Sequence, residues 1–248
     1  MSASFGLDIA GMTDTGRVRS HNEDSIGWDL TRNLAVLADG MGGHCAGDVA
    51  SKMAVDGVLR EYRSVGSDSV DDKAAIARLL DHINDDIYRS AQADSDCSRM
   101  GTTLVMACLN GDHITVAHAG DSRVYRFRHG QIEQLTEDHS LVRQLIEQGT
   151  MTKEDAENSR YSNVITRALG VRVGCEIEIN QYQVDIDDVY LLCSDGLSNK
   201  VSDESMRLLL DDSNGDWAQT GQALVDQANQ AGGEDNISVV LAVVTTTL

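Results

Sequence analysis

The chain of 248 residues contains no proline, and only 4% of its residues are aromatic. Average usage would place about 12 prolines in a chain of this length, so the turns must be built from Gly, Asp, Asn and Ser. No stretch approaches the roughly 18 consecutive apolar residues of a membrane span. The N-terminal MSASFGLDIA also lacks a basic leader and a long apolar region. We therefore expect neither a membrane span nor a signal peptide.

Paired cysteines and basic residues are also scarce. The five cysteines are an odd number, widely spaced and without a CxxC pair, which indicates neither a disulfide framework nor a zinc ribbon, so we expect a reducing cytoplasm. Twenty basic and forty acidic residues give a formal charge of −20. Nucleic acid and anionic membranes are therefore not expected as partners, because both need a basic face. The acidic excess indicates either solubility or pairing with bound cations.

The hydrophobic content of 41% suits one large domain or two small ones, and we expect one. Strand-like runs at 6–12, 25–30 and 34–38 precede two stretches of helical period at 46–62 and about 71–93. Strands then return with turns at 110–112 and 129–130, followed by a helix after Asp138, further strands, two helices and a last strand at 237–244. Hairpin-linked strands with helices in blocks predict an α+β fold with antiparallel sheets.

Several aspartates share one local pattern, in which each lies at the end of an apolar strand beside a glycine. They are Asp39 in VLADG, Asp121 in AHAGDSR and Asp195 in YLLCSDG, while Asp235 in GGEDN precedes the last strand. Asp-Gly is a routine turn dipeptide, so any single example is best interpreted as a turn. Four such aspartates, each beside an apolar strand, are less readily explained as turns alone. Clustered carboxylates repel one another and need cations, and oxygen ligands favour Mg²⁺ or Mn²⁺ over zinc.

Two charged or glycine-rich stretches add to this pattern. VLADGMGGH, residues 36–44, could be a hairpin turn, a phosphate cradle or the mouth of a metal site, and it lacks the GK[ST] or GxGxxG pattern of a nucleotide cradle. GRVRSHNEDS contributes Arg17, Arg19, Glu23 and Asp24. Arginine is well shaped to hold a phosphate by two parallel hydrogen bonds, although a solvated charged turn is the alternative interpretation.

Seven short motifs carry a resemblance to a known family. They are RxxxED (19–24), ADGMGGH (38–44), MGTT (100–103), GDSR (120–123), DHS (138–140), CSDGL (193–197) and GGEDN (232–236). Their order resembles that of bacterial PPM, or type 2C, metal-dependent Ser/Thr protein phosphatases, over nearly the whole chain from about residue 6 to 244. The resemblance implies a four-layer α-β-β-α sandwich, in which helices flank two antiparallel sheets and metal ions bind at one end of the sheets.

The resemblance also implies a role for each acidic residue. Asp39 would bridge two Mn²⁺ or Mg²⁺ ions, and the Gly40 carbonyl would bind the second. Asp195 and Asp235 would complete the shell of the first ion. Glu23 and Asp24 would lie beside the second ion, directly or through water. Asp121 would join Asp195 in a third, weaker site. Glu23 stands where many bacterial relatives have Gln, which leaves its direct ligation open.

Substrate-facing roles are implied as well. Arg19 matches the phosphate-binding arginine, and His44 resembles a histidine that assists protonation of the leaving group, so Arg19, His44 and Asp39 are the expected catalytic residues. Residues 141–162 fall where the family has a flap that helps set substrate preference. The whole chain, 1–248, would form a single catalytic domain that carries this flap.

The residues themselves suggest a mechanism. Two divalent ions about 3.5–4 Å apart would lower the pKa of a shared water, which attacks phosphorus while Arg19 offsets charge on the phosphate oxygens. We expect a cytoplasmic, monomeric phosphatase acting on phosphorylated Ser/Thr proteins, the substrates of a bacterial Ser/Thr kinase. The alternatives are a small-molecule phosphoesterase on the same fold and a non-catalytic phosphoprotein-binding regulator.

Overall fold

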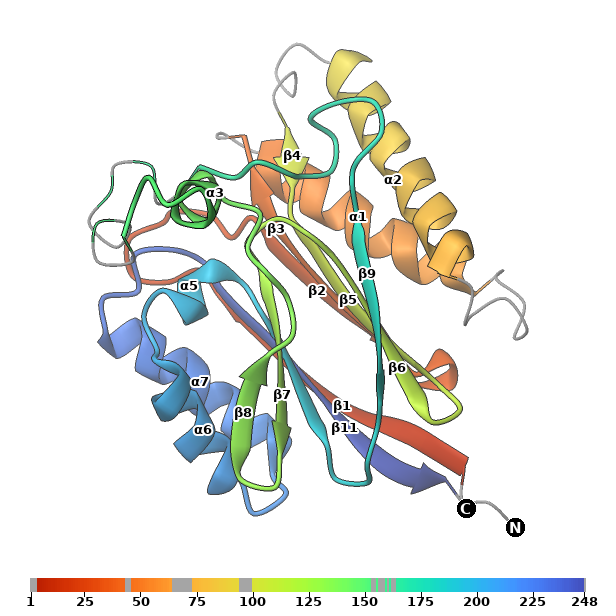
Figure 1. Cartoon of the computed structure of the whole chain (residues 1–248), viewed down its shortest axis with the longest axis vertical. Helices are drawn as coiled ribbons and strands as arrows, with labels where there is room; N and C mark the ends of the chain where they lie inside the picture. The colour runs from red at the N-terminus through yellow and green to blue at the C-terminus, as the bar shows by residue number, and fades with distance from the viewer. Residues whose placement is uncertain are drawn as a thin grey trace.

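The computed structural model describes residues 4–42, 46–63, 73–93, 100–152, 155, 159, 161 and 164–247. Two antiparallel sheets stack in the middle of the molecule, and helices cover the outer face of each (Figure 1). The predicted α-β-β-α sandwich is therefore confirmed.

The first sheet has five strands in the order β1-β11-β10-β7-β8. Their bounds are Ser4–Asp14 for β1, Ile237–Thr247 for β11, Val189–Cys193 for β10, Arg123–Arg128 for β7 and Gln131–Gln134 for β8. The first and last strands pair along their whole length, because β1 and β11 form a continuous antiparallel ladder. The strands β10 and β11, which precede and follow the last two helices, lie at the centre of this sheet.

The second sheet contains the path β2-β3-β5-β6-β9, and β4 pairs with β3 beside it. Its strands are Asp24–Asp29 for β2, Leu34–Met41 for β3, Gly101–Thr102 for β4, Leu104–Asn110 for β5, His113–Ala119 for β6 and Glu178–Gln183 for β9. A 3-10 helix, Leu30–Arg32, makes the turn between β2 and β3. The turn between β7 and β8 uses His129 and Gly130, both at positive φ, as a tight two-residue hairpin requires.

Helices α1, Ala46–Tyr62, and α2, Lys73–Ala93, cover the second sheet. Helices α6, Asp203–Asp211, and α7, Trp217–Gln230, cover the first (Figure 1). The short helix α5, Asp195–Ser198, packs with α6 and α7 on the first sheet, and another short helix, α3, Leu141–Glu147, lies outside the layers. The period of 3.6 predicts α1 with its observed bounds and α2 to within two residues of its start, since an amphipathic stripe is the strongest sequence signal for a helix.

Three hydrophobic clusters fill the three interlayer spaces. One packs α1 and α2 on the second sheet and includes Val58, Ile83 and Met106. Another lies between the two sheets and includes Leu37 and Val240. The third packs α5, α6 and α7 on the first sheet. Strands such as β10, whose five residues are all buried, are therefore apolar on both faces. Among the described residues, no helix combines the length and apolarity needed to cross a bilayer.

Candidate metal centre

The site begins with a pair of acidic residues in the second sheet. Asp24, the first residue of β2, lies directly opposite Asp39 of β3 in the antiparallel register. Side chains of directly opposed residues lie on the same face, and like charges in such positions destabilise a sheet. The sequence pattern predicted Asp39 at the end of a strand. The structure instead places it inside β3, which continues through Gly40 and Met41 and pairs there with β4. The correction places Asp39 on a rigid, doubly paired backbone.

Two further aspartates come from the first sheet. Asp195 follows β10 as the first residue of α5, and Asp235 precedes β11. These segments are joined where Ser194 N–H donates to the Ser238 carbonyl at 3.1 Å. Asp121 lies in the connection between β6 of one sheet and β7 of the other. Strands of both sheets, and the segments next to them, therefore contribute aspartates to the candidate site.

Mutual electrostatic effects show that these side chains converge. Burial raises the pKa of Asp39 well above its ordinary value, and the charges of the other four raise it further: Asp24, Asp195, Asp121 and Asp235. Burial, followed by neighbouring carboxylates, raises the pKa of Asp24 to about 7 and that of Asp195 to about 6. The pKa of Asp121 rises to about 7 for the same reasons. The mutual shifts indicate that these five aspartates are neighbours, and their roles as metal ligands stay a prediction.

The two carboxyl oxygens of Asp24 differ in their hydrogen bonding. Ser194 Oγ donates to its Oδ2 at 2.9 Å, and the Ser238 hydroxyl also acts on the carboxyl and lowers its pKa, whereas Oδ1 is buried without a partner in hydrogen-bond geometry among the described residues. A buried carboxylate oxygen without a donor is costly, and either protonation or a bound cation removes that cost.

Glu23 and Gly40 lie together beside the start of α1. Gly40 N–H donates to the Glu23 carbonyl at 3.1 Å. A Cβ on Gly47 would come within 2.8 Å of the Glu23 carboxyl carbon and 2.9 Å of the Gly40 carbonyl oxygen. The Glu23 carboxyl and the Gly40 carbonyl therefore both lie against Gly47, where any side chain would displace them.

Arg19 reaches the same cluster from the segment after β1. Its Nη2 donates to Asp235 Oδ2 at 2.7 Å, and its side chain is 49% exposed. The exposed guanidinium of the predicted phosphate-binding residue is therefore held beside a predicted metal ligand. His44, the third predicted catalytic residue, lies outside the described residues.

Several hydroxyl and amide side chains that hold the cluster in place were not assigned roles from the sequence. Thr103 Oγ1 accepts the Asp39 N–H at 2.9 Å, and Thr102 Oγ1 donates to the Asp39 carbonyl at 2.9 Å. The Asn236 side chain accepts the Glu23 N–H at 2.8 Å and donates to the carbonyl of His21 at 2.9 Å. Their position next to acidic motif residues, in MGTT and GGEDN, is the signal that could have identified them.

The donor set suits hard divalent cations. It consists of carboxylates and one backbone carbonyl, with an unpartnered buried oxygen at Asp24 and no room for a side chain at Gly40. Oxygen-only ligands favour Mg²⁺ and Mn²⁺. The residues therefore fit the ions that the resemblance implies.

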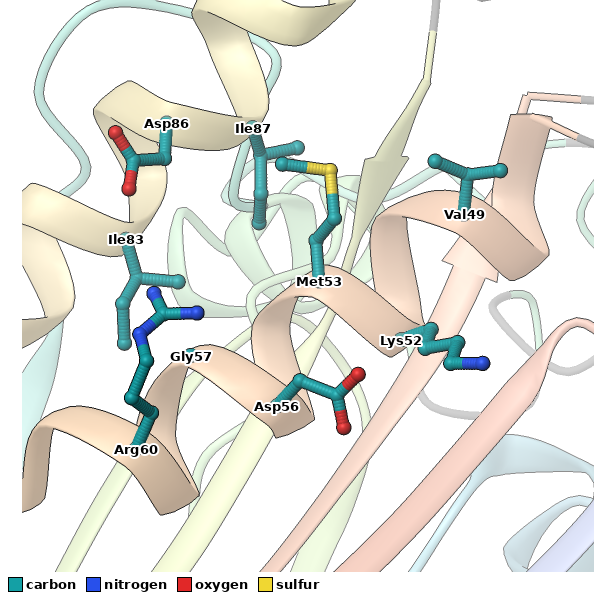
Figure 2. Close-up of a pocket in the computed structure, with 9 residues that line it drawn as sticks. All are labelled: Val49, Lys52, Met53, Asp56, Gly57, Arg60, Ile83, Asp86 and Ile87. Atoms are coloured by element: carbon teal, nitrogen blue, oxygen red, sulfur yellow. The ribbon is translucent and has the colours of Figure 1, made fainter. Parts of the chain in front are cut away.

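A separate pocket of about 490 Å³ lies between α1 and α2 (Figure 2). Its apolar floor includes Met53, Ile83 and Ile87, and charged side chains such as Lys52 and Asp56 lie at its rim. Of the predicted site residues that the structure describes, none lines it. We place the functional site at the acidic cluster and not in this pocket, because the pocket lacks the convergent carboxylates and the strongly raised pKa values of the cluster.

Comparison with known proteins agrees with this geometry. The protein phosphatase 2C family model matches residues 15–242. A serine/threonine phosphatase, stp, of Listeria monocytogenes is 38% identical over 234 residues, covering 92% of each chain. The crystal structure of the Mycobacterium tuberculosis serine/threonine phosphatase PstP/Ppp superimposes with a TM-score of 0.88 at 35% identity, covering 96% of this chain and 98% of that one.

A further solved structure is informative about metals. The catalytic domain of the serine/threonine protein phosphatase PstP in complex with two manganese ions has a TM-score of 0.83 and 35% identity, covering 98% of this chain and 100% of that one. The family model, these relatives and the acidic cluster agree. The chain belongs to the protein phosphatase 2C family of metal-dependent serine/threonine protein phosphatases.

Proposed function

We propose that this chain hydrolyses phosphoserine and phosphothreonine in proteins, with Mn²⁺ or Mg²⁺ held by the acidic cluster. The observation that carries the proposal is the cluster of five aspartates, in which burial and the charges of its neighbours raise the pKa of Asp39 well above its ordinary value. Asp39 would bridge two ions, with Asp195 and Asp235 on one side. Glu23, Asp24 and the Gly40 carbonyl would serve the other ion, and Asp121 with Asp195 a weaker third.

The protein's own residues orient the substrate. When bound, the ions lower the pKa of a water and so supply the nucleophile at neutral pH. Arg19 makes a single hydrogen bond among the described residues, to Asp235, which leaves guanidinium donors for two phosphate oxygens. We assign protonation of the leaving alkoxide to His44, as the resemblance implies. Residues 141–162, which include α3, would form the flap against which the rest of the substrate binds.

We also infer the setting of the enzyme. Cys175 and Cys193 are free thiols, which supports a reducing cytoplasm. The substrates would be proteins phosphorylated by a bacterial Ser/Thr kinase, met by a monomer formed of one catalytic domain over residues 1–248. Neither nucleic acid nor a membrane is expected as a partner, given the formal charge of −20.

The test is hydrolysis of a phosphothreonine peptide in Mg²⁺, in Mn²⁺ and in excess chelator. We expect turnover only with a divalent ion, and a loss of about a thousandfold or more in Asp195→Asn because a ligand is removed. A matched control is Asp212→Asn, an exposed residue at the end of α6.

Two results would contradict the proposal. Full activity in chelator would remove the metal from the reaction. Faster turnover of free nucleotides than of phosphopeptides would instead favour the small-molecule phosphoesterase.

A further inference from the structure

His139, in the DHS motif, is bound to the turn that carries Asp121. The Gly120 N–H donates to His139 Nδ1 at 3.2 Å, and the His139 N–H donates to the Gly120 carbonyl at 2.9 Å. His139 is only 8% exposed. His139 therefore hydrogen-bonds through both its ring and its backbone to Gly120, which immediately precedes the predicted metal ligand Asp121.

The opposite side of the same turn packs against Thr103. Gly120 has φ +114°, and a Cβ there would lie within 2.6 Å of a Thr103 methyl carbon. Thr103 Oγ1 also hydrogen-bonds to Ser122 Oγ at 2.8 Å and accepts the Asp39 N–H. The turn at 120–122 is thus wedged between His139 and the residue that fixes Asp39. A change at either support would move Asp121 relative to Asp39.

The tautomer of His139 follows from its neighbours. Its Nε2 lies 3.0 Å from Arg167 Nη1 and 3.6 Å from Glu178 Oε2. A neutral imidazole ring has one acceptor nitrogen, whereas two N–H donors face the ring, Gly120 at Nδ1 and Arg167 at Nε2. The Gly120 N–H is fixed by the paired backbone, whereas Arg167 is a long side chain that also pairs with Glu176 at 3.3 Å. We therefore assign the acceptor to Nδ1 and the proton to Nε2, facing Glu178.

Two features keep His139 neutral and fixed in orientation. The His118 ring stacks on it with centroids 4.5 Å apart and planes 9° apart, and His118 Nε2 donates to the Glu137 carbonyl at 2.9 Å. Burial, followed by the charges of His118 and Arg167, lowers the pKa of His139 to about 4. The acceptor at Nδ1 is consequently retained throughout the neutral pH range.

His118, His139 and Glu178 are also side chains that bind transition metals, and their ligand atoms lie within 4.8 Å of one another. The geometry does not favour an ion there. Nearly parallel stacked rings direct their lone pairs side by side and not toward one point. The remaining nitrogen of His139 also faces the Arg167 cation.

We propose that His139 is a positioning residue for Asp121, acting through the hydrogen bond from Gly120 to its Nδ1. This inference rests on the proposed function, in which Asp121 helps to hold the weakest of the bound ions. Neighbours that orient a metal ligand typically change affinity by about 10–100-fold when they are removed. The ions held by Asp39 should be less affected, because Thr103 holds that residue directly by accepting its backbone N–H.

Three variants separate the roles of the ring. In His139→Asn the amide oxygen can replace the Nδ1 acceptor, in His139→Gln the amide extends toward the Nε2 position, and in His139→Leu volume remains without an acceptor. All three keep the backbone N–H that donates to Gly120. We would titrate each purified protein with Mn²⁺, following free Mn²⁺ by electron paramagnetic resonance, to obtain the number and affinity of bound ions.

We expect the weakest Mn²⁺ to bind about tenfold or more weakly in His139→Leu and His139→Gln, and less than about threefold more weakly in His139→Asn. Equal losses in Asn and Leu would show that only the ring's packing matters, and an unchanged Leu variant would show no role; either overturns the proposal. If Leu does not fold, the Asn and Gln variants decide it. Failure of the proposed function would appear separately, as a wild-type protein without Mn²⁺-dependent hydrolysis.

Discussion

The Ser194 hydroxyl donates to Asp24 Oδ2 at 2.9 Å, while Asp24 Oδ1 remains buried without a partner among the described residues. This half-satisfied carboxyl lies directly opposite Asp39 across two paired strands. The arrangement is unfavourable for a metal-free protein at neutral pH and favourable once a cation is present, since the ion supplies the missing partner and offsets the repulsion. The Asp24 carboxylate should therefore lower the stability of the metal-free protein and raise its affinity for metal ions.

Replacement of Asp24 by asparagine tests this opposition. The pKa of Asp24 is raised from 3.8 to about 7, so its charge opposes folding increasingly as pH rises from about 4 to 7, and fully above that. In chelator, Asp24→Asn should therefore raise the melting temperature by an amount that grows over this pH window. Thermal unfolding from pH 4 to 8 measures it. A lower melting temperature than wild type at pH 8 would contradict the interpretation.

The same substitution should weaken metal binding. Loss of a carboxylate from the cluster is expected to lower the Mn²⁺ affinity of one ion by about tenfold or more, measured by calorimetric titration. Ser194→Ala is the matched control: it removes the donor to Oδ2 but keeps the charge. Without metal, Ser194→Ala should be less stable than wild type, because the buried Asp24 Oδ2 loses its hydrogen-bond donor. The variant should retain most of its Mn²⁺ affinity.

In the wild-type protein, stabilisation by Mn²⁺ should increase with pH. Asp24 and Asp121 have pKa values of about 7 and Asp195 of about 6, so near pH 5 protons compete with the ion for these carboxyls. We expect a larger rise in melting temperature with saturating Mn²⁺ at pH 8 than at pH 5. Calorimetry at pH 6.5 in two buffers of different ionisation heat should also show net proton release. A pH-independent effect of Mn²⁺ would indicate that the ions bind elsewhere.

The sequence predicts the elements better than their contacts. Helix α1 was predicted with its observed bounds because its apolar stripe is long and regular. Helix α5 was not predicted, because four residues are too few to show a period. The strand-end pattern identified Asp39, Asp121 and Asp195, yet it could not show that Asp24 lies opposite Asp39, since register depends on non-local pairing.

The supporting hydroxyl groups show the same limit. Thr103 bonds to Asp39, 64 residues away, and Ser194 to Asp24, 170 residues away. A threonine or serine beside an acidic motif is compatible with many local hydrogen bonds, so only the fold selects the distant partner. The resemblance to a family could assign ligands by position. The positioning role that we propose for His139 rests on its contacts with Gly120, which the sequence does not reveal.

Gly40 should tolerate no side chain. A Cβ there would lie 2.0 Å from the Gly47 carbonyl oxygen and 2.6 Å from the Glu23 carbonyl oxygen, both backbone atoms that cannot rotate away. We expect Gly40→Ala to lower the free energy of unfolding by at least about 3 kcal/mol, at the severe end of overpacking, and to abolish activity. Urea denaturation measures the first effect.

Gly111→Ala is its control. This glycine has φ +58° and open space around it, so alanine should cost about 1–2 kcal/mol from backbone strain alone and leave turnover unchanged. If the two substitutions destabilise the protein equally, the close approach of Gly40 to Gly47 does not restrict this position.

Arg19 should contribute to the reaction far more than to stability. Its ion pair with Asp235 is on the surface, and such pairs contribute about 1 kcal/mol or less, so Arg19→Ala should unfold within that margin of wild type. Its kcat/KM for a phosphopeptide should fall by about a hundredfold, because a charge-stabilising donor is lost.

Arg19→Lys should remain at least about tenfold impaired, since an ammonium cannot hold two phosphate oxygens in parallel. The matched control is Arg89→Lys on α2, where another exposed arginine pairs with Asp86 at 3.1 Å, and its kcat/KM should be unchanged. Wild-type kcat/KM in Arg19→Ala would show that the ions alone bind the phosphate.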